Sequence, residues 1–320
     1  MLGDIKRTWC DRGSYSYDLG KPDHRYSYRR GHSYSAPRQL KRQWFLRNVA
    51  FLALITYATI FFGHDARSQA ISSNDASAKA VSPPLAEEFI RIVGQHLVVP
   101  AATALDYAVL LDAALAVAGI REITPKFILL VDRNPNVQVL LLYWGTAEGS
   151  WTLVGASSIS TGLPGRYQHF KTPLGVFEHS LENPDFRAEG TKNQFGIRGY
   201  GNKGSRIYDF GWVKAPRGWG DGHIGELRLQ MHSTDPDVLE QRIGTAQSEG
   251  CIRIPSQLND FIDHYGILDE DYDRVVAAGN HLWVLQKDRV PTPWSGRYLV
   301  VLESAVATRP EWAMQVPKRR

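Results

Sequence analysis

The chain has 320 residues, of which 43% are hydrophobic and 22% charged, and it contains two cysteines, Cys10 and Cys251. This composition is that of a globular protein and excludes collagen-like, fully disordered and disulfide-framework classes. The net charge of +4 comes from residues 1–48, where 11 Lys and Arg face 4 Asp and Glu, whereas residues 49–320 carry a net charge of −3. Because a nucleic-acid groove needs positive charge on the folded part, we expect no nucleic-acid partner.

The first 84 residues have the layout of an export signal followed by a linker. Residues 1–43 are rich in Ser, Tyr and Arg without apolar periodicity, which indicates a basic cytoplasmic tail or an extended n-region. The signal or anchor segment over 44–63 has an uncharged core of about 15 residues, shorter than the roughly 20 that span a bilayer comfortably. A cleaved signal and an uncleaved inner-membrane anchor both remain open. In either case the chain after the linker over 64–84 is expected to be exported, either periplasmic or membrane-anchored and facing the cell wall.

Residues 85–125 are helical in character, and most of this segment is apolar. A second membrane span would place Asp106 and Asp112 in the bilayer, at about 2.5–3.5 kcal/mol each near its centre. We therefore expect helices that pack on the main domain.

From residue 126 onward, short β-rich runs separated by turn residues predict a mainly β fold with short helices over 126–303, followed by a C-terminal tail over 304–320. The expected strands cover 127–131, 137–143, 151–160, 227–231, 281–286 and 298–302, and the expected short helices cover 259–265 and 271–278.

The candidate chemistry centres on Cys251, the only cysteine after the export segment. Gly250 before it allows a tight turn in which successive N–H groups converge, as an oxyanion hole requires. His232, at the end of an expected strand, is a candidate base that would lower the pKa of the thiol and accept its proton. Ser233 is placed to orient the imidazole through its hydroxyl or its carbonyl. By residue type alone, an inert buried cysteine and a structural histidine explain this pattern better.

Two spaced motifs change that balance. The segments Met231-His-Ser-Thr234 and Ser248-Glu-Gly-Cys-Ile-Arg253 resemble the catalytic motif of the L,D-transpeptidase (YkuD-like) family. Ser158-Ile-Ser-Thr-Gly162, followed by Lys171-Thr-Pro-x-Gly-x-Phe177, is similar to the strand–loop–strand that precedes the active site in that family. The resemblance covers 126–303 and implies an L,D-transpeptidase β-sandwich catalytic domain, preceded here by the helical segment.

The resemblance also implies a reaction. Cys251 would attack the carbonyl of the third, diacid residue of a peptidoglycan stem tetrapeptide, release D-alanine and form a thioester that an amine on a second stem converts into a 3→3 cross-link. His232 maps onto the general base, Ser233 onto the residue that orients it, and the N–H groups of Gly250 and Cys251 onto the oxyanion hole. No metal or cofactor is implied, and carbapenem-type β-lactams are the expected inhibitors.

The resemblance leaves two possible roles for each of three further residues. Arg253 would serve substrate carboxylates or hold the loop through its carbonyls, and Ser248 would organise the loop or act directly in the active site. Glu249 stands where many members carry His. A carboxylate directed at the thiol would raise the pKa of that thiol, whereas a solvent-facing one would not.

Residues 179–226 form a long insertion-like stretch, read either as a lid or substrate wall or as structural padding. Within it, Gly199-Tyr-Gly-Asn-Lys-Gly204 matches a dinucleotide-binding pattern, but no βαβ unit surrounds it, so we expect no such site. The sequence favours an exported L,D-transpeptidase. The alternatives are a cysteine peptidoglycan hydrolase (carboxypeptidase or amidase) of the same fold, in which water resolves the thioester, and a non-catalytic cell-wall binding protein.

Overall fold

The computed structural model describes residues 83–120, 125–146 and 149–316. The expected tail over 1–43 and the export segment over 44–63 lie outside the described residues, as does nearly all of the linker. Within the described part, no helix combines the length and the apolar character that crossing a membrane requires.

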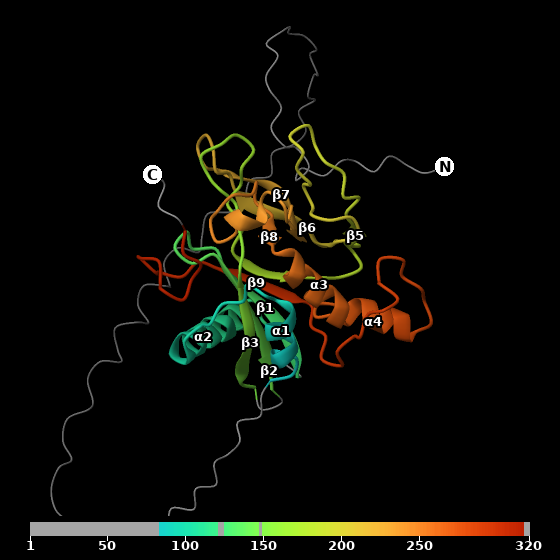
Figure 1. Ribbon diagram of the computed structural model, residues 1–320. Coiled ribbons are helices and arrows are strands. Elements are labelled where there is room, and N and C mark those ends of the chain that lie inside the picture. Colours follow the sequence, from blue (N-terminus) through green and yellow to red (C-terminus); the bar gives the residue numbers. More distant parts are fainter. Residues whose placement is uncertain (1–82, 121–124, 147–148, 317–320) are drawn as a thin grey trace, which may run out of the picture. The chain divides into compact units, whose positions relative to one another are not determined.

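Two mixed sheets and a few short helices make up the described part of the chain (Figure 1). The strands are β1 (Lys126–Asp132), β2 (Val139–Gly145), β3 (Trp151–Ser158), β4 (Gly175–Glu178), β5 (Phe186–Arg187), β6 (Arg206–Pro216), β7 (Ile224–Ser233), β8 (Ile252–Ile254) and β9 (Tyr298–Leu302). The helices are α1 (Ala86–Ile92), α2 (Ala101–Val117), α3 (Ser256–Tyr265) and α4 (Glu270–Ala277), with a 3-10 turn, η2 (Glu240–Arg242). Sheet A has the strand order β3-β2-β1-β9-β4 and sheet B the order β5-β6-β7-β8. This architecture confirms the expected mainly β fold class with short helices.

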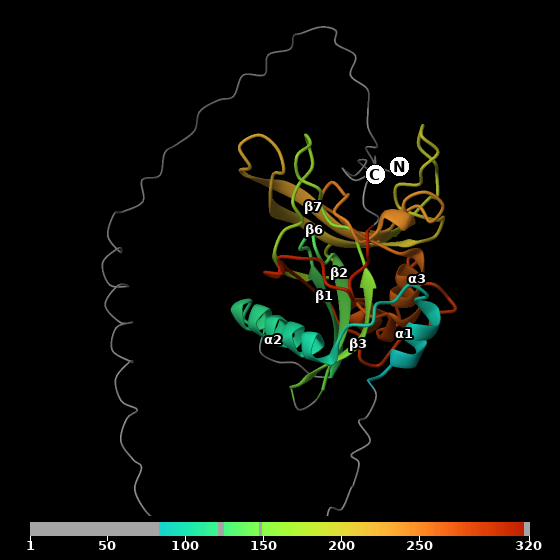
Figure 2. The same cartoon turned by 60° about the vertical axis from the view of Figure 1, so that its left-hand side comes forward.

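The central strands of sheet A, β1 and β2, are continuous apolar runs, and both of their faces are buried. Along β1, Phe127, Leu129 and Val131 belong to one core cluster, which residues of β6, β7 and α3 complete, and Ile128 and Leu130 belong to a second, which α2 completes. Figure 2 shows α2 on one side of sheet A, and α1 with α3 on the other. Sheet B therefore packs on the face of sheet A that α2 does not cover.

Most of the expected elements are present, and one is wrong. The strands expected over 127–131, 137–143, 151–160, 227–231 and 298–302 correspond to β1, β2, β3, β7 and β9, and the two expected helices to α3 and α4. The strand expected over 281–286 is wrong, because this segment forms turns. The Nε of Arg187 donates to the Val284 carbonyl at 2.8 Å, so an acceptor that a strand ladder would use is already bound.

The helical segment expected over 85–125 contains α1 and α2. Tyr107, Leu111 and Leu115 of α2 are buried against sheet A, and the Tyr107 hydroxyl donates to Asp132 at 2.6 Å. The insertion-like stretch over 179–226 supplies β5, β6 and the start of β7, so it builds most of sheet B.

A buried ionic cluster joins sheet B to the last two helices. The fully buried Arg206 at the start of β6 donates to Asp185 at 2.7 Å, to Asp263 of α3 at 3.2 Å and to Asp269, before α4, at 2.7 Å. His179 Nε2 lies 2.9 Å from the Asp185 carboxylate. Since each buried charge has an opposite partner, the ion pairs offset the desolvation cost. The cluster thereby fixes β6, α3 and the start of α4 relative to one another.

Candidate active site

Sheet B places His232 on one strand and Cys251 directly before the neighbouring strand. His232 is the penultimate residue of β7, and Cys251 directly precedes β8, which runs parallel to β7 with Arg253 opposite His232. Successive side chains of a strand point to opposite faces. Because Met231 and Ile252 point into the core cluster, His232 and Arg253 point to the other face of the sheet. His232 near the end of β7 and Cys251 just before β8, 19 positions apart in sequence, are therefore carried by two paired strands of sheet B, β7 and β8 (Figure 1).

The His232 ring is held in one tautomer. Its Nδ1 lies 2.7 Å from the Ser233 carbonyl oxygen, which can only accept a hydrogen bond, so Nδ1 carries the proton. Nε2 is buried and has no hydrogen-bond partner among the described residues, which leaves it as a bare acceptor. Burial lowers the pKa of His232 to about 3, the Arg253 charge adds to this effect, and the Ser233 carbonyl opposes it. The imidazole is therefore neutral.

Ser233 uses its carbonyl for His232 and its hydroxyl elsewhere. The hydroxyl donates to the Tyr200 carbonyl at 3.1 Å, and the Tyr200 ring stands edge-on to the His232 ring with centroids 4.6 Å apart. Gly201 has a φ of 82°, and a Cβ there would lie 2.1 Å from the Ser233 hydroxyl oxygen. The glycine-rich stretch that imitates a dinucleotide motif is therefore a packing loop over the end of β7. Sequence reasoning missed Tyr200, although the glycines on both sides of it were a usable signal of close approach.

The loop before Cys251 is organised by Ser248. The Ser248 hydroxyl donates to the Cys251 carbonyl at 2.5 Å and accepts the Gly250 N–H at 3.1 Å. Gly250 has a φ of 128°, and a Cβ there would lie 2.8 Å from a methyl group of Leu227, so only glycine fits without displacement. The Gly250 N–H, which the family resemblance maps onto the oxyanion hole, is engaged within the loop in this conformation.

The second sequence signature meets this loop. The Gly162 N–H donates to the Thr172 hydroxyl at 2.9 Å, and the Thr172 hydroxyl donates to the Gly250 carbonyl at 2.8 Å. The Phe170 N–H donates to the Glu249 carbonyl at 3.1 Å. The two motifs, about 80 residues apart, are thus parts of one hydrogen-bonded structure.

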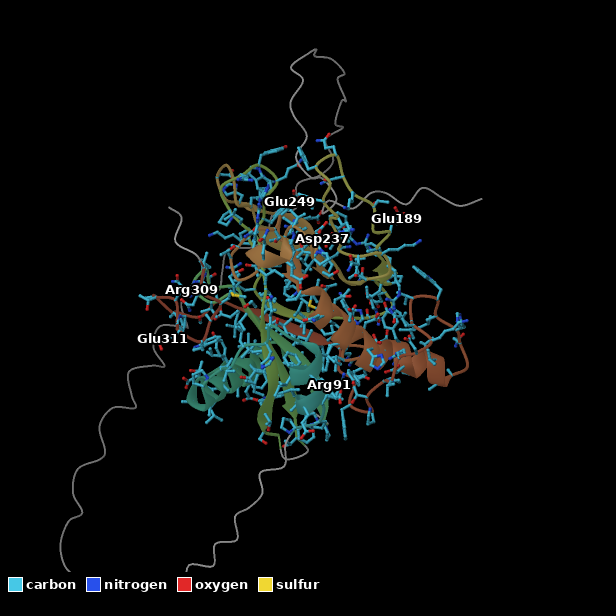
Figure 3. All side chains as sticks on the ribbon, viewed as in Figure 1. Arg91, Glu189, Asp237, Glu249, Arg309 and Glu311 are labelled. Carbon is cyan, nitrogen blue, oxygen red and sulfur yellow. The ribbon has the colours of Figure 1, made fainter. Side chains whose placement is uncertain are left out.

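Arg253 places a positive charge beside His232. Its Nε is buried and has no hydrogen-bond partner among the described residues. Burial lowers the pKa of Arg253, while the charges of Glu249 and Tyr200 oppose that shift. The half-buried Glu249 carboxylate therefore acts on Arg253, and Figure 3 shows Glu249 at the upper end of sheet B.

The site is closed to solvent. The exposed fraction is 1% for both His232 and Cys251, and the Cys251 sulfur lies 4.0 Å from the Arg228 carbonyl oxygen. Acyl transfer needs Cys251 as the reduced thiol, and the other cysteine of the chain, Cys10, precedes the expected export segment and lies outside the described residues. Because Cys251 and His232 are both buried, the covering loops must also move before a substrate can reach them.

A cavity of about 270 Å³ lies elsewhere, between α1 and the end of α3. Its lining residues are Arg91, Ile92, Asp260, Asp263, His264, Tyr265 and Gln286. Figure 3 shows Arg91 and Glu249 far apart, so this cavity is separate from the Cys251 loop. Within the described ranges, no three His, Cys, Asp or Glu side chains are grouped as metal ligands would be.

No family model and no curated protein matches the chain. Solved structures that match include a fused Zn-dependent amidase/peptidase/peptidoglycan-binding domain-containing protein from Clostridium acetobutylicum, 13% identical, with a TM-score of 0.26 over 64% of this chain and 63% of that one. Another is the helical cell shape determining protein Pgp2 from Campylobacter jejuni, 16% identical, with a TM-score of 0.26 over 61% of this chain and 56% of that one. The chain thus covers less than two thirds of either protein. At these scores the likeness supports no transfer of fold or activity, and any functional conclusion rests on the geometry around His232 and Cys251.

Proposed function

We propose that this chain is an exported cysteine acyltransferase of the L,D-transpeptidase type that acts on peptidoglycan stem peptides. The observation that carries the proposal is the neutral His232, whose Nδ1 is fixed by the Ser233 carbonyl and whose bare Nε2 lies on the strand beside the Cys251 loop. A base oriented by a third group beside a nucleophile is the arrangement that covalent acyl transfer uses.

The proposed reaction has two halves. In the first, reduced Cys251 gives its proton to His232 Nε2, and the sulfur bonds to the carbonyl carbon of the third stem residue. The bond to D-alanine then breaks, and the departing amine takes the proton from the imidazolium, which leaves a thioester. In the second half, an acceptor amine loses a proton to His232 and bonds to the same carbon. The thiolate then leaves and is reprotonated.

In the closed site His232 is a poor base, so substrate binding has to raise the pKa of His232. Moving a proton from an ordinary thiol, with a pKa near 8.5, to an imidazole with a pKa of about 3 is uphill by roughly 7 kcal/mol. A substrate carboxylate bound to Arg253 would cancel one of the two causes of that low pKa, and entering water would weaken the other. We therefore assign Arg253 a role in coupling substrate binding to the basicity of His232.

The loops around Cys251 would also rearrange. If the Gly250 N–H leaves the Ser248 hydroxyl, it becomes free to bind the developing oxyanion. Ser248 then holds the resting loop, and Thr172 keeps the Gly250 carbonyl in place.

The test is the intact mass of the full-length chain after exposure to a carbapenem, with and without a thiol reductant, alongside Cys251→Ala and His232→Ala. We expect one adduct on the reduced wild type, none on Cys251→Ala, and strongly slowed formation on His232→Ala. Stem tetrapeptide with an acceptor amine then separates a transferase, which forms the new amide, from a hydrolase, which releases the free acid. If the reduced thiol reacts with a small alkylating agent but never with the carbapenem or the tetrapeptide, a binding protein is the better description.

A further inference from the structure

Two loops beside the Cys251 loop are locked together. One is residues 159–174, between β3 and β4, and the other is residues 217–223, between β6 and β7. The Gly165 N–H donates to the Gly218 carbonyl at 2.6 Å, and the Gly218 N–H donates to the His169 carbonyl at 2.7 Å. A Cβ at Gly218 would lie 2.4 Å from that His169 oxygen, so glycine permits this contact. Both loops project from the end of sheet B in Figures 1 and 2.

These loops carry three rings in edge-on contact, which we name the aromatic platform: Tyr167, Phe170 and Trp219. The Phe170 and Trp219 centroids are 4.8 Å apart, and those of Trp219 and Tyr167 are 5.7 Å apart. Phe170 is buried and Trp219 half-buried, whereas 66% of Tyr167 is exposed. Gln168, next to Tyr167, has a φ of 66°, which is uncommon for a residue other than glycine. The loop therefore holds a large ring in solvent.

Two arginines lie next to platform residues in the chain, Arg166 directly before Tyr167 and Arg217 two positions before Trp219. The Arg217 guanidinium carbon lies 5.8 Å from the centre of the Trp219 ring, and Arg166 and Arg217 are both exposed. Guanidinium groups donate paired hydrogen bonds to hydroxyl and carboxylate oxygens. The exposed Tyr167 ring, with such donors on the same two loops, fits a ligand with C–H faces and a rim of oxygens, which is the chemistry of a pyranose sugar.

The platform is continuous with the candidate active site. Phe170 donates its N–H to the Glu249 carbonyl, and its side chain packs beside Gly250, the residue before Cys251. A ligand on Tyr167 and Trp219 would therefore extend from the position where the stem peptide is proposed to react.

We infer that the aromatic platform binds a sugar of the glycan strand to which the reacting stem peptide is attached. The identity of this sugar as an acetamido sugar of peptidoglycan rests on the proposed function. Binding itself requires only the rings and guanidinium groups described here, and it does not require Cys251.

The test is a titration of the full-length chain with the tetramer of β-1,4-linked N-acetylglucosamine, followed by calorimetry and by tryptophan fluorescence. Wild type and Cys251→Ala are expected to bind equally. Tyr167→Ala is expected to bind about tenfold more weakly, and Tyr167→Phe, which keeps the ring, to stay within about threefold of wild type. Trp283→Ala is the matched control, because Trp283 is 68% exposed in the loop after α4 and should leave binding unchanged.

The outcomes separate this inference from the proposed function. No binding by the wild type, or equal binding by Tyr167→Ala, overturns the platform even if the carbapenem adduct forms. If tetramer binding depends on Tyr167 but no carbapenem adduct forms, the aromatic platform is supported and the proposed transferase activity is rejected. Equal thermal unfolding of Tyr167→Ala and wild type establishes that the weaker binding is not a folding defect.

Discussion

The Tyr200 ring stands edge-on to the His232 imidazole, at a centroid separation of 4.6 Å and an interplanar angle of 73°. The same residue accepts the Ser233 hydroxyl through its carbonyl, so one loop residue fixes both the ring of the candidate base and the residue that orients it. Tyr200 therefore acts on the chemistry through His232, as a positioning residue.

Tyr200→Leu is expected to slow carbapenem acylation of Cys251 by about tenfold, because an edge-on aromatic contact contributes about 0.5–1.5 kcal/mol and its loss frees the imidazole. Tyr200→Phe keeps the ring and loses the hydroxyl bond to Gln230, at about 1 kcal/mol of stability. Adduct formation by intact mass, with thermal unfolding in parallel, checks this. A folded Tyr200→Leu protein that is acylated at the wild-type rate would contradict the positioning role.

Gly250→Ala is expected to destabilise the protein by about 1–3 kcal/mol and to abolish acylation, because its φ of 128° and the Leu227 contact leave no room for a methyl group. The control is Gly220→Ala, since Gly220 also has a positive φ, 61°, but no atom within 4 Å of a Cβ. It should cost about 1 kcal/mol and leave acylation intact. Denaturant unfolding gives the stabilities, and equal loss of acylation in both variants would speak against a specific role of Gly250.

His232 is expected to remain neutral from pH 8 to pH 5, because its pKa in the folded protein is about 3. Nitrogen chemical shifts of the ring should stay constant across this range in the wild type. In Arg253→Gln the pKa of His232 should rise, since one of the two causes that lower it is removed. A folded pKa below the unfolded value contributes stability above about pH 6.5, and that contribution is lost as the pH falls. If His232 titrated near its ordinary pKa in the wild type, this would contradict the burial of its ring in the closed site.

The His179–Asp185 pair is expected to give the opposite dependence. Burial lowers the pKa of His179, but the Asp185 charge and hydrogen bond outweigh it, so the net shift is upward. A raised folded pKa contributes stability that is complete below about pH 6.5 and is lost as the pH rises through the folded pKa. The stability difference between wild type and His179→Gln should therefore shrink from pH 6 to pH 9 in urea unfolding. A difference that is constant or grows with pH would mean that His179 is buried neutral.

Local pattern was enough to predict much of the fold. The continuous apolar runs of β1 and β2 predict strands that are buried on both faces of the sheet. The turn residues between the two runs predict the hairpin. The position of His232 at the end of β7 followed from alternation in a short segment. The segment over 281–286 has the same apolar character, but the Arg187 side chain binds its backbone, and nothing local to the segment announces that contact.

The candidate site was only partly predictable for the same reason. The resemblance of two spaced motifs to a known family pointed to His232 and Cys251 as candidates, whereas Tyr200, Thr172 and the engaged Gly250 N–H depend on contacts between distant segments. The cluster around Arg206 joins carboxylates up to 63 positions away, which no periodicity in the sequence reveals.

The parallel pairing of β7 with β8 also affects how the sequence between His232 and Cys251 can differ among related proteins. Parallel neighbours cannot be joined by a tight turn, so the chain between His232 and Cys251 must cross from one end of the strand pair to the other. Residues can be added to or removed from that crossover while the ladder keeps both ends in place. The number of residues between His232 and Cys251 can therefore differ between relatives that keep the same geometry. A motif search that fixes this number would miss such relatives.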